Sequence, residues 1–157
     1  MIMVDVQSRA AGAPAAPRIR RFLGRVARAT GSRAAEVSVL FCADARMRTL
    51  NRRYRGKDKT TDVLAFPAGP GAVSEGFLGD IVISVPYAAR EARRREDTRS
   101  REIDRLLVHG FLHLLGYDHE TDEGQMDALE SRLRRRLGLA ADSRTARALP
   151  PRAGKRR

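Results

Sequence analysis

Cysteine, tryptophan and long apolar runs are scarce or absent in this chain. Cys42 is the single cysteine among 157 residues, so no internal disulfide can form and a disulfide-stapled scaffold is excluded. No apolar run is long enough to cross a bilayer as a helix, so no membrane association of that kind is expected. The first residues lack a basic segment followed by an apolar stretch, so no secretory signal is expected and the cytoplasm is the predicted compartment.

Acidic residues are few relative to basic ones. The sequence has 31 Lys and Arg against 19 Asp and Glu, a formal net charge of +12. Such a charge predicts attraction to polyanions, with nucleic acid first and an anionic membrane surface second. Arginine far outnumbers lysine, a bias that genome composition can also produce, so charge alone leaves nucleic-acid binding open.

Histidine is also rare, and the three histidines all lie within residues 109–119. His109 and His113 are four residues apart and would share one face of a helix. His119 follows Gly116, which can end a helix in a left-handed conformation and turn the chain back. Three converging imidazoles are typical of a catalytic zinc site with its fourth position open. The alternative is three unrelated histidines on a buried helix.

Hydrophobic periodicity predicts an α+β domain with a small, mixed, four-stranded sheet surrounded by about five helices. Strands are predicted over residues 2–7, 36–42, 62–66 and 77–85. Helices are predicted over 18–30, 44–54, 86–97, 101–115 and 122–137, with Ser100 as the N-cap of the fourth. The first strand, helix and strand predict a parallel pair, whereas the last two strands, joined by a loop over 68–76, should form a hairpin.

The helix predicted over 101–115 is apolar nearly all round, which places it at the centre of the domain. Two histidines on such a helix are costly to bury unless their nitrogens have partners, and a metal supplies them. Residues 1–138 are predicted to form one metal-dependent hydrolase domain. Residues 139–157 are rich in proline, small and basic residues and are predicted to be a disordered tail.

The histidine spacing also matches the metzincin proteases, which place a glutamate directly after the first histidine as general base. Here that position is Gly110, so a protease on this template would lack its proton acceptor. A phosphodiester substrate fits better, because a metal and an arginine can stabilise charge on phosphate oxygens together. Either the 2′-hydroxyl of RNA or an activated water could be the nucleophile.

Three segments resemble the YbeY family of bacterial endoribonucleases, which mature ribosomal RNA and act in ribosome quality control. They are YRGKDKTTDVLAFP at 54–67, LGDIVIS at 78–84 and HGFLHLLGYDH at 109–119. The resemblance runs in order over roughly residues 2–138. It implies a metal-dependent, single-strand-specific endoribonuclease whose partners are ribosomal RNA and the small ribosomal subunit.

The resemblance also assigns roles to residues. His109, His113 and His119 match the family's metal ligands, with one zinc ion expected and nickel, copper or iron as alternatives. Arg55 matches an arginine of the active-site cleft, and Arg55 and His109 are the residues expected to carry the reaction. Asp80 is expected either to orient a ligand or to cap its strand locally, and Asp118 to stabilise the turn or to support a ligand from behind. Lys57 and Lys59 are expected either to contact the RNA backbone or to be merely exposed.

Two features qualify this interpretation. Ala65 stands where the family usually has serine, so any contribution of that hydroxyl is absent. The basic tail is longer than the family norm and either adds non-specific RNA affinity or is inert.

Two other functions fit parts of the pattern: a non-catalytic ribosome assembly factor with a structural metal, and a metzincin-like hydrolase of another substrate.

Overall fold

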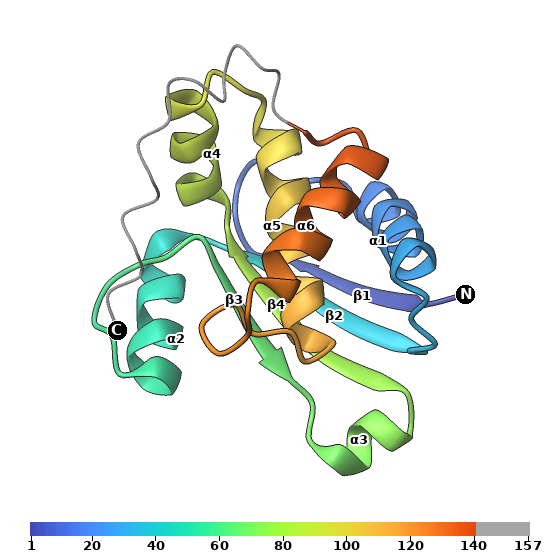
Figure 1. The fold of residues 1–157 in the computed structure, drawn as a ribbon. Helices are drawn as coiled ribbons and strands as arrows, with labels where there is room; N and C mark the ends of the chain where they lie inside the picture. The colour runs from blue at the N-terminus through green and yellow to red at the C-terminus, as the bar shows by residue number, and fades with distance from the viewer. Residues whose placement is uncertain (141–157) are drawn as a thin grey trace.

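A four-stranded mixed sheet forms the framework of the computed structural model, which describes residues 1–140 (Figure 1). The strands are β1 (Met3–Ser8), β2 (Glu36–Cys42), β3 (Val63–Pro67) and β4 (Phe77–Ser84), in the spatial order β1-β2-β4-β3. The first two strands are parallel and β3 pairs antiparallel with β4. Both predicted pairings, the mixed sheet and the α+β class are therefore confirmed.

Six helices accompany this sheet in the described part of the chain, one more than predicted. They are α1 (Ala16–Thr30), α2 (Asp44–Arg55), α3 (Pro70–Ser74), α4 (Val85–Arg94), α5 (Arg99–Leu114) and α6 (Gln125–Arg136). The short α3 lies in the segment predicted as a loop, and Pro70 suits its first turn because proline fixes a helical φ. The predicted N-cap Ser100 is wrong: Thr98 accepts the hydrogen bond from the Arg101 N–H at 3.2 Å.

The two faces of the sheet carry cores of unequal size. Helices α1, α5 and α6 pack on one face over the larger core, and Figure 1 shows them side by side. Ile81 and Ile83 of β4 belong to this core, whereas Val82 points to the other face and packs with Met47 and Leu50 of α2. Because side chains alternate along a strand, successive residues of β4 belong to the cores on opposite faces of the sheet.

Helix α5 is buried along almost its whole length, as its apolar sequence predicted. Its buried charges have partners: Asp104 accepts two hydrogen bonds from Arg18, at 3.0 and 2.7 Å. Arg105 donates to Glu102 at 3.1 Å and to the Leu139 carbonyl at 3.4 Å. Leu139 is itself buried in the large core. The packed part of the chain therefore extends beyond the predicted boundary at 138, and residues 141–157 of the predicted tail lie outside the described residues.

The single cysteine ends β2 and is buried in the smaller core. Burial raises the pKa of the Cys42 thiol to about 11, an effect that Arg46 opposes and Asp44 reinforces. The thiol is therefore protonated near neutral pH. Among the described helices, none is long and apolar enough to cross a membrane.

Candidate metal centre

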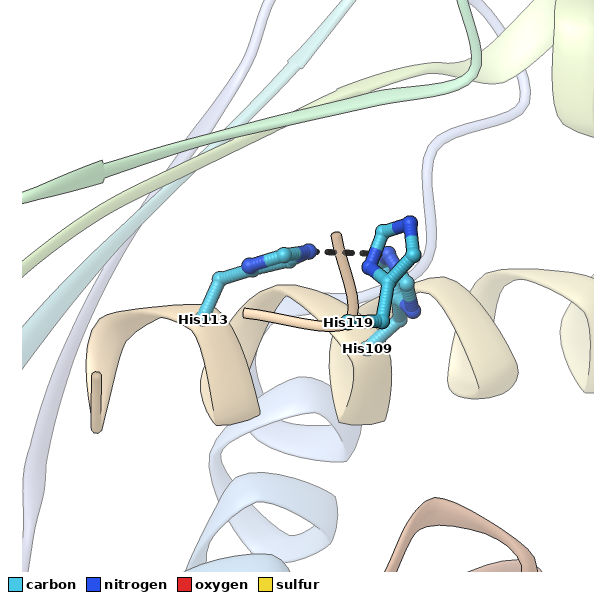
Figure 2. A group of neighbouring side chains, drawn as sticks. All are labelled: His109, His113 and His119. Carbon is cyan, nitrogen blue, oxygen red and sulfur yellow. Dashed lines mark hydrogen bonds between the residues drawn. The ribbon is translucent and has the colours of Figure 1, made fainter. Parts of the chain in front are cut away.

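Helix α5 brings the first two histidines together on one face. Because they are one helical turn apart, the rings of His109 and His113 meet edge to face, with their centroids 4.7 Å apart. Their Nε2 atoms are 3.1 Å apart, as Figure 2 marks with a dashed line. Two nitrogen ligands of a tetrahedral zinc ion lie about 3.3 Å apart. The pair is thus spaced either for a shared ion or for an N–H···N hydrogen bond.

A tight turn after α5 delivers the third histidine. Gly116 has a φ of 97°, a left-handed conformation that side chains rarely adopt. The Tyr117 N–H donates to the Leu112 carbonyl at 3.1 Å, which turns the chain back along the helix. The His119 ring then lies 5.6 Å from that of His109 and 5.5 Å from that of His113, centroid to centroid. Figure 2 shows the three imidazoles gathered over one stretch of α5.

The three rings fit a metal ion. One nitrogen from each ring lies within 4.8 Å of the others. The Nδ1 atom of His119 is buried without a hydrogen-bond partner among the described residues. A buried ring nitrogen without a partner is costly, and a cation at this point would remove that cost. Three imidazoles are also a donor set that binds zinc.

Glu130 of α6 holds the first histidine from behind. Both of its carboxylate oxygens lie 3.2 Å from Nδ1 of His109. A carboxylate at this place favours a proton on Nδ1 and leaves Nε2 to face the other histidines. Arg134 donates to Glu130 at 2.7 Å and keeps the carboxylate in place. Sequence reasoning missed Glu130, although it occupies a buried position of α6 between Met126 and Leu133.

Arg55 shares a cleft of about 310 Å³ with His109 and His113. It is the last residue of α2, its side chain is exposed, and it makes no hydrogen bond or ion pair with another described residue. The structure therefore brings together the arginine and the histidines that the sequence singled out. Ala65 of β3 also lines this cleft, and its methyl group supplies no hydroxyl where the family usually has serine.

Asp118 lies at the rim of this histidine cleft and shapes the turn. Its carboxylate accepts a hydrogen bond from the Glu120 N–H at 2.9 Å, and this bond is the main cause of its lowered pKa. Tyr117 also lines the cleft and is partly exposed.

Three other candidates lie elsewhere. Asp80, expected either to orient a ligand or to cap its strand locally, lies on the opposite face of the sheet, because its neighbour Ile81 packs against α5. Partial burial there raises the pKa of the Asp80 carboxyl. Lys57 and Lys59 belong to the loop after α2 and do not line the cleft.

The family model described as "Endoribonuclease YbeY" matches residues 10–138. The chain belongs to the YbeY family. Two curated relatives carry the name Endoribonuclease YbeY and share 47% and 46% identity with it. The first, from Anaeromyxobacter sp. (strain Fw109-5), aligns with 82% of this chain and 68% of its own length. The second, from Solibacter usitatus, aligns with 78% of this chain and 80% of its own length.

The fold has a solved counterpart as well. The solution structure of TM1509 from Thermotoga maritima superposes with a TM-score of 0.60, covering 86% of this chain and 89% of that one at 24% sequence identity. At that identity the likeness supports the fold alone. Membership of a family of endoribonucleases makes the chain a nuclease-type hydrolase and sets aside the alternative of a metzincin-like hydrolase of another substrate.

Proposed function

We propose that this protein is a zinc-dependent endoribonuclease that cleaves single-stranded RNA in the bacterial cytoplasm during ribosomal RNA maturation, acting at the small ribosomal subunit. The observation that carries the proposal is the convergence of His109, His113 and His119, of which His109 and His113 share one cleft with Arg55. Family membership supports RNA as the substrate, since the curated relatives are named endoribonucleases.

His109, His113 and His119 would hold the ion, with nickel, copper or iron as alternatives to zinc. A bound zinc ion supplies Lewis acidity and lowers the pKa of water to about 7, so no glutamate base is needed at Gly110. Glu130 keeps Nδ1 of His109 engaged, which presents Nε2 to the ion. His113 and His119 would complete a three-histidine site among the described residues, with one position of the ion left for substrate.

Arg55 grips the scissile phosphate. Its guanidinium is exposed at the cleft and unpaired with other described residues, so it is available to an anion. A guanidinium presents two parallel N–H donors that match phosphate oxygens and stabilise the charge that develops there. Lys57 and Lys59, in the loop that follows Arg55, would attract the flanking backbone.

A single strand suits this cleft better than a duplex. The histidine cleft is about 310 Å³ and lies beside the edge strand β3. An unpaired nucleotide can be splayed into such a space, whereas a stacked and paired one stays in its helix.

The test is cleavage of a single-stranded ribosomal RNA fragment by the purified protein, beside His113→Ala and Arg55→Ala. His113→Ala should abolish cleavage, and Arg55→Ala should lower kcat/KM by roughly 100-fold while zinc content is unchanged. Arg21→Ala, an exposed arginine of α1, is the matched control and should cleave normally. Equal cleavage by the parent and His113→Ala would contradict the proposal, because the activity would then lie outside the histidine cleft.

A further inference from the structure

A second cavity, of about 400 Å³, lies on the face of the sheet that carries α2. We call it the α2-side cavity. Its floor is a row of residues that face one another across all four strands: Asp5 of β1, Ser38 of β2, Asp80 of β4 and Phe66 of β3. Such cross-strand neighbours have Cβ atoms about 5 Å apart, so the row forms one continuous surface. It runs from a carboxylate at one edge of the sheet to an aromatic ring at the other.

The aromatic end of the cavity is built for stacking. Tyr54 of α2 is 58% exposed, although tyrosine is a large and largely apolar side chain. Phe66 supports it edge to face, with the ring centroids 5.3 Å apart. The Arg53 guanidinium lies 5.4 Å from the Tyr54 ring centre. An exposed ring held by a second ring and flanked by arginine is the usual platform for an unpaired nucleobase.

The polar end of the cavity offers acceptors without partners. Asp80 makes no hydrogen bond or ion pair with any other described residue, and partial burial raises the pKa of its carboxyl. Two oxygens on a carboxylate can accept from two adjacent N–H donors, such as N1–H and N2–H of guanine. The carboxylates of Asp5 and Asp80 outnumber the single arginine of the lining, Arg46, so the cavity suits a base better than the RNA backbone.

Only one strand separates this cavity from the histidine cleft. Ala65 and Pro67 of β3 line the cleft, whereas Phe66 between them lines the α2-side cavity. The end of α2 is divided in the same way: Arg55 reaches the cleft and Tyr54 the cavity. A strand with its phosphate at Arg55 could therefore place a neighbouring base across β3 onto Tyr54.

We propose that the α2-side cavity binds a nucleobase of the RNA strand held in the histidine cleft, stacking it on Tyr54 and reading guanine through Asp80. The identity of the strand rests on the proposed function. A basic peptide is the other occupant that two carboxylates would suit, but the formal charge of +12 on this chain disfavours a basic partner, and a peptide would make no use of the continuity with the cleft.

Base binding can be tested without cleavage. The ¹⁵N-labelled protein is titrated with guanosine, adenosine, cytidine and uridine monophosphates, and with ribose 5-phosphate as the probe that lacks a base. Guanosine monophosphate should shift the amides of Ser38, Tyr54, Phe66 and Asp80 most, and ribose 5-phosphate should not. Tyr54→Ala should weaken binding roughly tenfold, whereas Tyr54→Phe should retain it.

Asp80→Asn tests the base preference separately. It should remove a roughly tenfold advantage of guanosine over adenosine monophosphate while stacking persists. Glu75→Gln, which removes a charge from an exposed residue beside α3, is the matched control and should behave as the parent. In an RNA cleavage assay, Tyr54→Ala should lose the preference for guanine at one position beside the cleaved bond.

Three results would overturn the proposal: amide shifts confined to the histidine cleft, no nucleotide response at the cavity up to millimolar concentration, or an arginine-rich peptide that shifts the cavity amides where nucleotides do not. If the unchanged protein binds guanosine monophosphate at Tyr54 but does not cleave RNA, the proposed nuclease function is wrong, whereas the proposed base-binding site is supported.

Discussion

The contact between Glu130 and His109 is a buried interaction directly beside the three-histidine site. Both carboxylate oxygens lie 3.2 Å from Nδ1, and Arg134 holds one of them at 2.7 Å. A second layer of this kind orients a ligating imidazole and raises its basicity. The ring of His109 is thereby fixed before any ion binds.

Removing Glu130 should therefore weaken metal binding without unfolding the protein. We expect Glu130→Ala to lower zinc affinity roughly 10- to 100-fold, and Glu130→Gln to lower it less, because an amide oxygen still accepts from Nδ1–H. Competition with a chelating dye measures the dissociation constant. Asp127→Asn, exposed on the same helix, is the control; equal affinity in Glu130→Ala and the control would contradict this role.

At the scale of elements, α5 and β4 approach each other closely at Gly110. A Cβ built on Gly110 would lie 2.9 Å from Cγ2 of Ile81, a fully buried side chain. The residue that a metzincin would use as its base is thus also the point where the helix rests on the sheet. Any side chain here, including glutamate, must displace Ile81.

Gly110→Ala should destabilise the protein by about 1–2 kcal/mol, because overpacking outweighs the gain in helix propensity. In an Ile81→Ala background the same change should be neutral or stabilising, because the obstructing branch is gone. Urea unfolding of the four proteins gives the coupling energy. Additive effects of the two substitutions would show that the close contact carries no strain.

Asp44 joins α2 to its surroundings. It accepts hydrogen bonds from Arg90 of α4 at 2.7 Å, from Ser84 of β4 at 2.9 Å and from Thr60 at 3.0 Å. The Arg90 hydrogen bond is the main cause of the lowered pKa of Asp44. Since α2 ends with Tyr54 and Arg55, this carboxylate positions the element that contributes one side chain to each cavity.

Asp44→Asn should lower stability by about 1 kcal/mol at pH 7. Because the folded pKa lies below the unfolded value of 3.8, the contribution of Asp44 is present above pH 3.8 and is lost as pH falls through the folded pKa. The gap between parent and variant should therefore shrink as the pH falls below 3.8 in urea unfolding. A gap that stays constant over this range would contradict the assignment.

The sequence predicted the histidine site and most elements because these depend on local spacing. His109, His113 and the turn at Gly116 follow from helical periodicity and glycine conformation. Glu130 was missed because its partner is 21 residues away, so only the packing of α6 on α5 reveals it. The sequence left open whether Asp80 orients a ligand or caps its strand, because β4 is buried on both faces and alternation then gives no signal of which face meets the histidines.

At the scale of the whole molecule, the net charge governs how RNA is attracted. Residues 141–157 carry six basic residues and one acidic residue. Each phosphate neutralised on a single strand adds about 0.7 to the slope of log affinity against log salt. The charges of residues 141–157 can therefore increase the salt dependence of RNA binding, independently of the contribution of the cleft.

A chain ending at Ala140 should bind a single-stranded RNA with a salt slope smaller by up to about 3.5, with its thermal unfolding unchanged. Fluorescence anisotropy between 50 and 300 mM salt measures both slopes. Identical slopes for the two chains would mean that the tail does not touch RNA.

The buried cysteine can report how often the native state opens. The pKa of the Cys42 thiol is raised to about 11, and its side chain is buried in the smaller core under α2. Cys42 can therefore react with a thiol reagent only when that part of the chain opens. The rate of labelling at this one atom therefore counts openings of the native state. A cysteine introduced on the surface would react with a thiol dye much faster than Cys42. The protein can therefore be labelled at one chosen surface site while Cys42 stays unlabelled and reports opening of the native state.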